Sequence, residues 1–377
     1  METMQKGTQG LYQRIRKLVK CLATASLAST TVALLLVLLQ GHDLAAASVS
    51  TSQTKKTVSM HSLPTSSGGL ITAGPSRKKC VELPKLPLIN GAFPVASGIA
   101  NFEAKTRTSV SCLLEYLNGA QTWAQWVNPD LRSPYEGVAA WITAAPQSRQ
   151  LVLQVDLIPA NLANQSDPLG WEQSCATGQF NAYAQQLGTN LVAGGFQNSV
   201  LRLGAEMNGP WENDFVGTTA VEQNLWATCF ANEVTSLRQV TGEHFLIDWN
   251  PNACYQDIPY ANYYPGNAYV DIVGLDFYDI SCMTPTTPVP WTQLSNLPAG
   301  LVSFETFANE HGKPLSFPEW GLMKSPRGDD PAYIKGVGST IARGDFAFEG
   351  YFDSGNDGTL PIGPASPLSL AEYQKWF

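Results

Sequence analysis

The chain of 377 residues is poor in charged residues and in histidine. Asp, Glu, Lys and Arg make up only 14% of it, and it has four histidines. It contains no Cys-x-x-Cys pair and no histidine cluster, so it offers neither a zinc site nor clustered ligands for a catalytic metal. The Gly-x-Ser-x-Gly elbow of many serine hydrolases is also absent, and the few histidines are poorly placed to pair with a serine. Hydrolysis through a metal or an activated serine is therefore not expected, and we expect no cofactor.

Basic residues are outnumbered by acidic ones, 23 to 31, which gives a formal net charge of −8. An acidic protein is a poor partner for nucleic acid or anionic lipid, because both carry negative charge. Hydrophobic residues make up 44% of the chain, and it has 10 tryptophans, as is typical of a globular protein with a large core. The composition therefore favours a neutral partner, and we expect a monomer that binds no nucleic acid.

The N-terminal segment differs in character from the rest. Four basic residues between Arg14 and Lys20 precede an apolar run from Cys21 to Leu39, and Ala45–Ala47 offers small residues for cleavage. This order is typical of a secretory signal, so we assign residues 1–47 to one and expect a secreted, extracellular protein. The alternative is an uncleaved membrane anchor, because the apolar run is long enough to span a bilayer. Cleavage would remove five basic and two acidic residues and change the net charge to −11.

Residues 48–78 are rich in Ser, Thr, Gly and Lys and have no periodic apolar pattern, which predicts a flexible spacer. The predicted catalytic domain covers residues 79–377. With Cys21 in the signal, six cysteines remain, and an even number in an exported protein predicts disulfides. Six cysteines allow fifteen pairings. The pairing we predict is Cys80–Cys112, Cys175–Cys229 and Cys254–Cys282.

Short β-rich runs alternate with helical stretches through the domain. The candidate strands cover residues 93–99, 109–116, 150–158, 199–207, 244–250, 270–278, 314–320 and 346–352. Several are apolar throughout, as in "LVLQVDLI", which is typical of parallel strands covered on both faces. Asp330 followed by Pro331 predicts the start of a helix. Eight such alternations predict an α/β fold with a single (β/α)8 barrel. The alternative is a doubly wound sheet, but no glycine-rich phosphate loop follows the first predicted strand.

Two predicted strands end in a glutamate. Glu206 ends the fourth strand and Glu319 the seventh, and each is followed closely by a tryptophan. In a barrel, the carboxyl ends of the strands meet at one mouth, where active sites lie. Two carboxyl groups across a pocket can cleave a glycosidic bond when one donates a proton and the other attacks the sugar or activates water. Ion pairs or loop caps would explain either glutamate alone but not both at matching strand ends.

Strand alternation adds supporting residues on the inner face. Arg202 precedes Glu206 by four residues and is expected to point inward, where its charge would keep a carboxylate such as Asp276 or Glu319 ionised. A structural ion pair in the barrel floor is the alternative for Arg202. Asn250 is expected to face inward, rather than its neighbour Trp249, and to be a substrate-binding residue.

Residues close to the two glutamates are candidates for contact with a sugar. Asn208 is expected either to bind a sugar hydroxyl or to close its loop. Trp211 and Trp320 follow the glutamates and are the predicted sugar-stacking residues. Glu212 and Asp214 lie in a polar stretch and are expected to be solvated, with contact to a sugar subsite as the alternative for either.

The stretches "LRLGAEMNGPW", "DWNPN", "YYPGNAYVDIVGLDFYD" and "PLSFPEWG" resemble the motifs of glycoside hydrolase family 26. That family contains β-mannanases and some β-glucan and β-xylan hydrolases, within the clan of retaining barrel glycosidases. The resemblance extends from about residue 93 to the C-terminus and is best over residues 199–322.

The resemblance implies a role for particular residues of this sequence. Glu206 would be the acid/base, Glu319 the nucleophile, Tyr278 a hydrogen-bond donor to Glu319, and Trp211 part of the sugar-binding wall. It also implies double displacement on a β-linked polysaccharide with retention of the anomeric configuration. One position departs from the family: Ala205 stands where its mannanases have a histidine before the acid/base, which puts mannan specificity in doubt. The alternative function is a carbohydrate-binding or cell-wall protein whose barrel has lost the chemistry.

Overall fold

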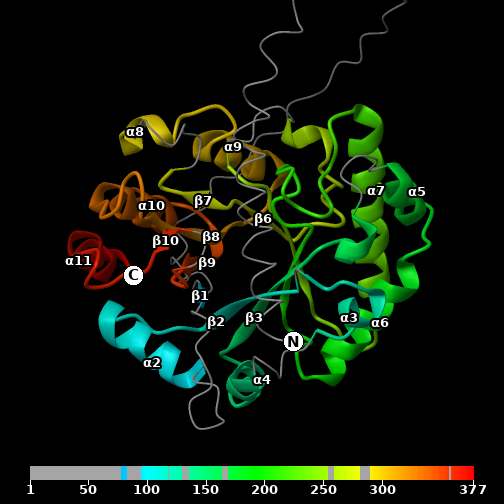
Figure 1. The fold of residues 1–377 in the computed structure, drawn as a ribbon, viewed down its shortest axis with the longest axis horizontal. Coiled ribbons are helices and arrows are strands. Elements are labelled where there is room, and N and C mark those ends of the chain that lie inside the picture. Colours follow the sequence, from blue (N-terminus) through cyan, green and yellow to red (C-terminus); the bar gives the residue numbers. More distant parts are fainter. Residues whose placement is uncertain are drawn as a thin grey trace, which may run out of the picture. The chain divides into compact units, whose positions relative to one another are not determined.

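Figure 1 shows the fold in a computed structural model. The structure describes residues 78–82, 95–117, 119–129, 136–163, 169–253, 259–280, 289–355 and 358–377. They all belong to one compact unit, residues 72–377. The predicted signal, nearly all of the predicted spacer and the predicted Cys254–Cys282 pair lie outside the described residues. Within these ranges no helix has both the length and the apolar character needed to cross a membrane.

A closed barrel of parallel strands forms the centre of the fold, as the sequence predicted. Its strands are β1 (Lys78–Glu82), β2 (Cys112–Tyr116), β3 (Gln150–Val155), β4 (Val200–Leu203), β5 (Leu246–Trp249), β6 (Ile272–Gly274), β7 (Phe277–Tyr278), β8 (Leu315–Met323) and β9 (Phe346–Phe352). β6 and β7 both pair with β8 and together occupy the sixth strand position, so the barrel has eight strand positions. β9 pairs with β1 and closes the ring. β10 (Thr359–Leu360) lies outside this ring and pairs antiparallel with β8.

Helices surround the barrel (Figure 1). Those of eight residues or more are α2 (Val95–Thr106), α4 (Glu136–Thr143), α5 (Leu169–Ala176), α6 (Asn181–Ala193), α7 (Ala220–Leu237), α9 (Leu301–His311), α10 (Pro331–Arg343) and α11 (Pro367–Trp376). Shorter turns are α3 (Trp123–Trp126), α8 (Trp291–Leu294), and the 3₁₀ segments η1 (Ala160–Leu162) and η2 (Tyr260–Asn262). The predicted helix start is confirmed, because Asp330 caps α10 by accepting the N–H of Tyr333 at 3.0 Å, with Pro331 as the first residue.

Alternation along the strands divides the barrel interior into layers. Side chains of one parity form a small apolar cluster inside the barrel, which contains Cys80, Cys112, Leu114, Val152, Val200, Ile272 and Phe348. The opposite parity packs against the helices in the main core. Two residues further along the strands, the inward positions become polar: Val152 is followed by Gln154 and Val200 by Arg202. The apolar layer therefore forms a floor beneath a polar layer at the carboxyl ends of the strands.

The first predicted strand is wrong. Residues 93–99 belong largely to helix α2, and the first barrel strand is β1, which begins at Lys78. Ile99, Phe102 and Thr106 of α2 are buried at helical spacing, so the period of the apolar residues and not their number decides the element. The charged stretch "KKCVE" forms the strand because Cys80 and Val81 are buried and paired with β2.

Two of the predicted disulfides are confirmed. Cys80 and Cys112 lie opposite each other on the paired strands β1 and β2, and their disulfide links these two strands. The Cys175–Cys229 bond joins α5 to α7. Both pairs are fully buried and belong to the packed interior.

Candidate active site

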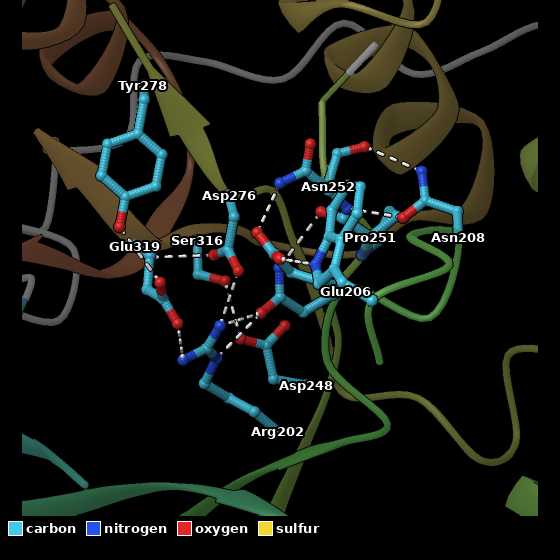
Figure 2. A network of polar contacts seen from close by, with 12 residues as sticks. Arg202, Glu206, Asn208, Asp248, Pro251, Asn252, Asp276, Tyr278, Ser316 and Glu319 are labelled. Atoms are coloured by element: carbon cyan, nitrogen blue, oxygen red, sulfur yellow. Dashed lines mark hydrogen bonds and ion pairs between the residues drawn. The ribbon is translucent and has the colours of Figure 1, made fainter. Parts of the chain in front are cut away.

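Glu319 is held by two donors at the inner face of β8. The guanidinium of Arg202 donates to its Oε1 at 2.8 Å, and the hydroxyl of Tyr278 donates to its Oε2 at 3.1 Å. The Glu319 side chain keeps 12% of its surface exposed, so one side remains open to a ligand. An ion pair with a buried guanidinium stabilises the charged carboxylate. The predicted partnership of Arg202 and Tyr278 with Glu319 is thus present (Figure 2).

Arg202 is the centre of the polar layer and has no exposed surface. It donates to Asp276 at 2.7 Å and to the amide oxygen of Asn250 from two nitrogens, at 2.8 and 2.6 Å. Asp276 in turn accepts the backbone N–H of Glu319 at 2.9 Å. The guanidinium and Asp276 therefore fix both the side chain and the backbone of the glutamate.

Glu206 lies just beyond β4, in a turn rather than in the strand. Its φ of 54° is in the left-handed region, which residues other than glycine rarely adopt. Two backbone hydrogen bonds hold this conformation: its N–H donates to Asn250 at 2.7 Å, and its carbonyl accepts from Gly209 at 2.7 Å. Such strained residues often occur at functional sites, where the surrounding structure overdetermines them.

The side chain of Glu206 is half-buried and accepts hydrogen bonds at both oxygens. The Trp211 indole donates to Oε2 at 2.6 Å, and the side-chain amide of Asn252 donates to Oε1. Burial raises the pKa of Glu206 to about 7, and the charge of Glu319 adds to the rise, while the bonds from Asn252 and Trp211 lower it. Glu206 therefore keeps its proton to a higher pH than an ordinary glutamate does, close to an ion-paired Glu319.

Asn252 was missed by the sequence reasoning, although it lies in the quoted stretch "DWNPN". It is the second residue after the inward-facing Asn250 and forms an isolated bridge with Asp276. Its backbone N–H donates to the side chain of Asn208 at 2.8 Å, and Asn208 donates back to its carbonyl at 2.9 Å. Asn208 thereby fixes the donor to Glu206 (Figure 2).

Three residues predicted to bind substrate take structural positions instead. Asn208 has no exposed surface and closes its loop by the bonds just described, which was one of its two predicted roles. Asn250 faces inward as predicted, but it is fully buried and accepts from Arg202. Trp320 is also fully buried, on the helix side of β8, where its indole donates to Glu349 at 2.7 Å. Strand alternation explains this position, since Glu319 faces inward and the next residue must face outward.

Trp211 fits its predicted place better. Its ring is half-buried beside Glu206, and a Cβ on Gly209 would come within 2.3 Å of the indole, so the ring packs flat on that glycine. Trp211, Tyr278 and Asn252 are all half-buried around the two glutamates. These partly exposed side chains form the accessible rim of the candidate site.

Comparison with known proteins relates this barrel and the segment that carries Glu206 to one family. The family model described as "Glycosyl hydrolase family 26" matches residues 181–299, which include Arg202, Glu206 and Asp276. No curated protein sequence matches the chain at a significant level.

Solved structures with the same fold agree with this match. A family 26 β-mannanase from Bacteroides ovatus has a TM-score of 0.55 at 13% identity, with 80% of this chain and 88% of that chain covered. The catalytic domain of a family 26 endo-β-1,4-mannanase from a Bacillus species has a TM-score of 0.53 at 19% identity, covering 80% and 85%. An endo-β-1,4-mannanase from Cellulomonas fimi has a TM-score of 0.54 at 19% identity, covering 80% and 70%. At such identities these likenesses show the fold alone.

The resemblance predicted from the motifs is therefore confirmed over residues 181–299, which match the family 26 model.

Proposed function

We propose that the protein is a retaining glycoside hydrolase that cleaves a β-linked polysaccharide by double displacement. The observation that carries the proposal is the different surroundings of two glutamates in one site. Glu319 forms an ion pair with the buried guanidinium of Arg202, whereas the pKa of Glu206 is raised to about 7 by burial. One carboxylate ready to attack and one carboxylic acid ready to donate are what the reaction requires.

In the first step, Glu319 attacks the anomeric carbon while Glu206 gives its proton to the departing glycosidic oxygen. The bond to that oxygen breaks, and a covalent bond from sugar to Glu319 forms. Arg202 and Tyr278 hold Glu319 in place by one bond to each of its carboxylate oxygens. In the second step Glu206, now ionised, takes a proton from a water molecule. The water oxygen attacks the anomeric carbon from the face that the leaving group occupied, opposite Glu319, and the bond to Glu319 breaks.

A β-linked polysaccharide is the substrate class suggested by the family and by the mannanases among the similar structures. Among the polymers of this class we place mannan first, with mixed-linkage glucan and xylan as alternatives. All three polymers are tested because Ala205 stands where the family's mannanases have a histidine, which puts specificity for mannan in doubt. The Ala205 side chain is 1% exposed and lies between the buried strand β4 and Glu206.

A hydrolysis screen tests the proposal. The purified full chain is incubated with mannan, mixed-linkage glucan and xylan, and released reducing ends are counted. The matched variant is Glu319→Gln, and the control is Glu305→Gln, which changes a glutamate on α9 that pairs with Arg343. We expect products from one polymer, unchanged in the control and reduced by at least about a thousandfold in Glu319→Gln.

Two outcomes would contradict the proposal. Products that persist in Glu319→Gln would mean that another residue is the nucleophile. Binding of a polymer without products, in the wild type and the variant alike, would indicate a carbohydrate-binding protein that lacks the chemistry.

We also propose that the protein is exported through its N-terminal segment. Two buried disulfides fit an oxidising compartment, and the basic-then-apolar order of the first residues fits a signal. N-terminal sequencing of the protein recovered from the culture medium is expected to begin near Ser48. Retention in the membrane fraction with the first residues intact would instead indicate an anchor.

A further inference from the structure

A second cluster of carboxylates lies beside the candidate active site. Asp156 follows β3, and Glu212 and Asp214 lie in the segment between β4 and α7 that also carries Glu206. One oxygen from each of the three lies within 4.8 Å of the others. The expected solvation of Glu212 and Asp214 is wrong for Asp214, which has no exposed surface, while Asp156 is 3% exposed and Glu212 is half-buried.

Each aspartate uses one oxygen for a protein hydrogen bond. Oδ2 of Asp214 accepts the N–H of Leu157 at 2.7 Å, and Oδ2 of Asp156 accepts the side-chain amide of Asn213 at 3.1 Å. The Oδ1 atoms of both are buried and make no hydrogen bond of ordinary geometry, although the side chain of Gln154 lies close enough to Asp156 to lower its pKa. None of the ion pairs between described residues includes any of the three carboxylates. A buried anionic oxygen without a partner is costly, and two of them in one cluster require positive charge or a proton.

The two aspartates are held in place before any ligand arrives. The carbonyl of Asp156 accepts the indole N–H of Trp126 at 2.8 Å, and that of Asp214 accepts the indole N–H of Trp226 at 2.8 Å. A Cβ on Gly204 would come within 2.7 Å of Trp226 and 3.1 Å of Oδ2 of Asp214, so the packing beneath the cluster is tight. The free oxygens therefore have fixed positions, as a preformed ligand site requires.

We propose that Asp156, Glu212 and Asp214 bind a calcium ion. The donors are oxygens only, which suits a hard cation and not zinc or copper. Ca²⁺–O bonds of about 2.3–2.6 Å place opposite ligands about 5 Å apart, so donors within 4.8 Å of one another fit its coordination sphere. Mg²⁺ demands near-octahedral geometry and gives up its waters reluctantly, so a set of three protein carboxylates suits it less well than Ca²⁺.

The half-exposed Glu212 provides the approach for the ion, and water would complete its coordination. The ion would join the segment after β3 to the segment that carries Trp211, whose indole holds Glu206. A proton shared between Asp156 and Asp214 is the other way to satisfy the free oxygens. Addition of calcium distinguishes the two.

The test is calorimetric titration of the full chain with CaCl₂ after removal of metal by a chelator, alongside thermal unfolding with and without the salt. We expect one Ca²⁺ per chain, a higher Tm in its presence and weaker binding of MgCl₂. Glu212→Gln and Asp156→Asn are each expected to weaken calcium binding by at least about tenfold, because each removes one ligand charge. Glu310→Gln, at an exposed position on α9, is the control and is expected to bind as the wild type does.

Absence of both heat and a Tm shift in the wild type would overturn the proposal and leave the shared proton as the explanation. Calcium binding that persists unchanged in both variants would place the ion elsewhere and overturn it too. Glu212→Gln decides the matter if Asp156→Asn does not fold, because the Glu212 side chain is partly exposed. The result is independent of any hydrolytic activity, since neither readout uses a polysaccharide.

Discussion

Arg202 gives the account its sharpest test, because the cation supports the site and the fold together. Arg202→Met keeps a side chain of comparable length but removes the charge. Asp276 and Glu319, which are 0% and 9% exposed, then lose their only ion-pair partner among the described residues. Loss of one member of a buried ion pair costs about 3–5 kcal/mol, because the remaining charge is left uncompensated. Unfolding entropy of about 2.1 cal/mol/K per residue over about 300 residues converts that loss to a fall in Tm of about 5–8 °C.

The assay is denaturant unfolding at pH 7, with Arg238→Met as the matched control. Arg238 also pairs with an aspartate, Asp271, but the pair is about one third exposed and is expected to contribute less than about 1 kcal/mol. Adding Asp276→Asn to Arg202→Met is expected to recover part of the lost stability, since it removes one of the two stranded charges. Equal losses in the two arginine variants, or no recovery in the double variant, would refute the electrostatic role assigned to Arg202.

Three further results are expected. Trp211→Phe removes a donor that lowers the pKa of Glu206. The alkaline limb of the plot of kcat/KM against pH, near pH 7 in the wild type, should therefore move up by about one pH unit. A limb that does not move would exclude Glu206 as the acid. Glu206→Gln should raise the free energy of unfolding by about 1–3 kcal/mol at pH 8 and leave it unchanged at pH 4, as urea melts at the two pH values would show. Folding raises the pKa of this carboxyl from 4.5 to about 7, so the stability that the wild type gains from the protonated carboxyl is lost as the pH rises between those values. Trp320→Phe should lower the free energy of unfolding by about 1–3 kcal/mol, because Glu349 loses the hydrogen bond from the indole N–H, and it should leave KM unchanged. A raised KM would indicate that Trp320 contacts the substrate after all.

Most of the barrel could be predicted because buried parallel strands leave a plain trace in the sequence. Strands such as β3 and β4 are buried on both faces and mostly apolar, so their composition identifies them better than alternation does. β1 escaped detection because its stretch "KKCVE" is short and charged, and its burial comes from pairing with β2 and β9. The error at residues 93–99 came from counting apolar residues without testing their spacing.

The inward positions of Glu319 and Arg202 could be predicted because both lie on strands, where a period of two applies. Glu206 lies in a turn just beyond β4, so only its place near the end of the strand could be predicted. The same rule would have placed Trp320 on the helix side, so that residue was predictable and was missed. Asn252 and the pairing of Asp156 with Asp214 could not be reached in this way. They depend on how separate segments fold back on one another, and no local pattern records such contacts.

The anomeric configuration of the first product tests double displacement most directly. Proton NMR would follow hydrolysis of the polymer identified by the screen, from the first minutes and before mutarotation. The account expects the β-anomer to appear first and the α-anomer to grow in slowly, because two displacements at one carbon restore the original configuration. Initial appearance of the α-anomer would contradict it, since a single displacement by water would then replace the attack by Glu319.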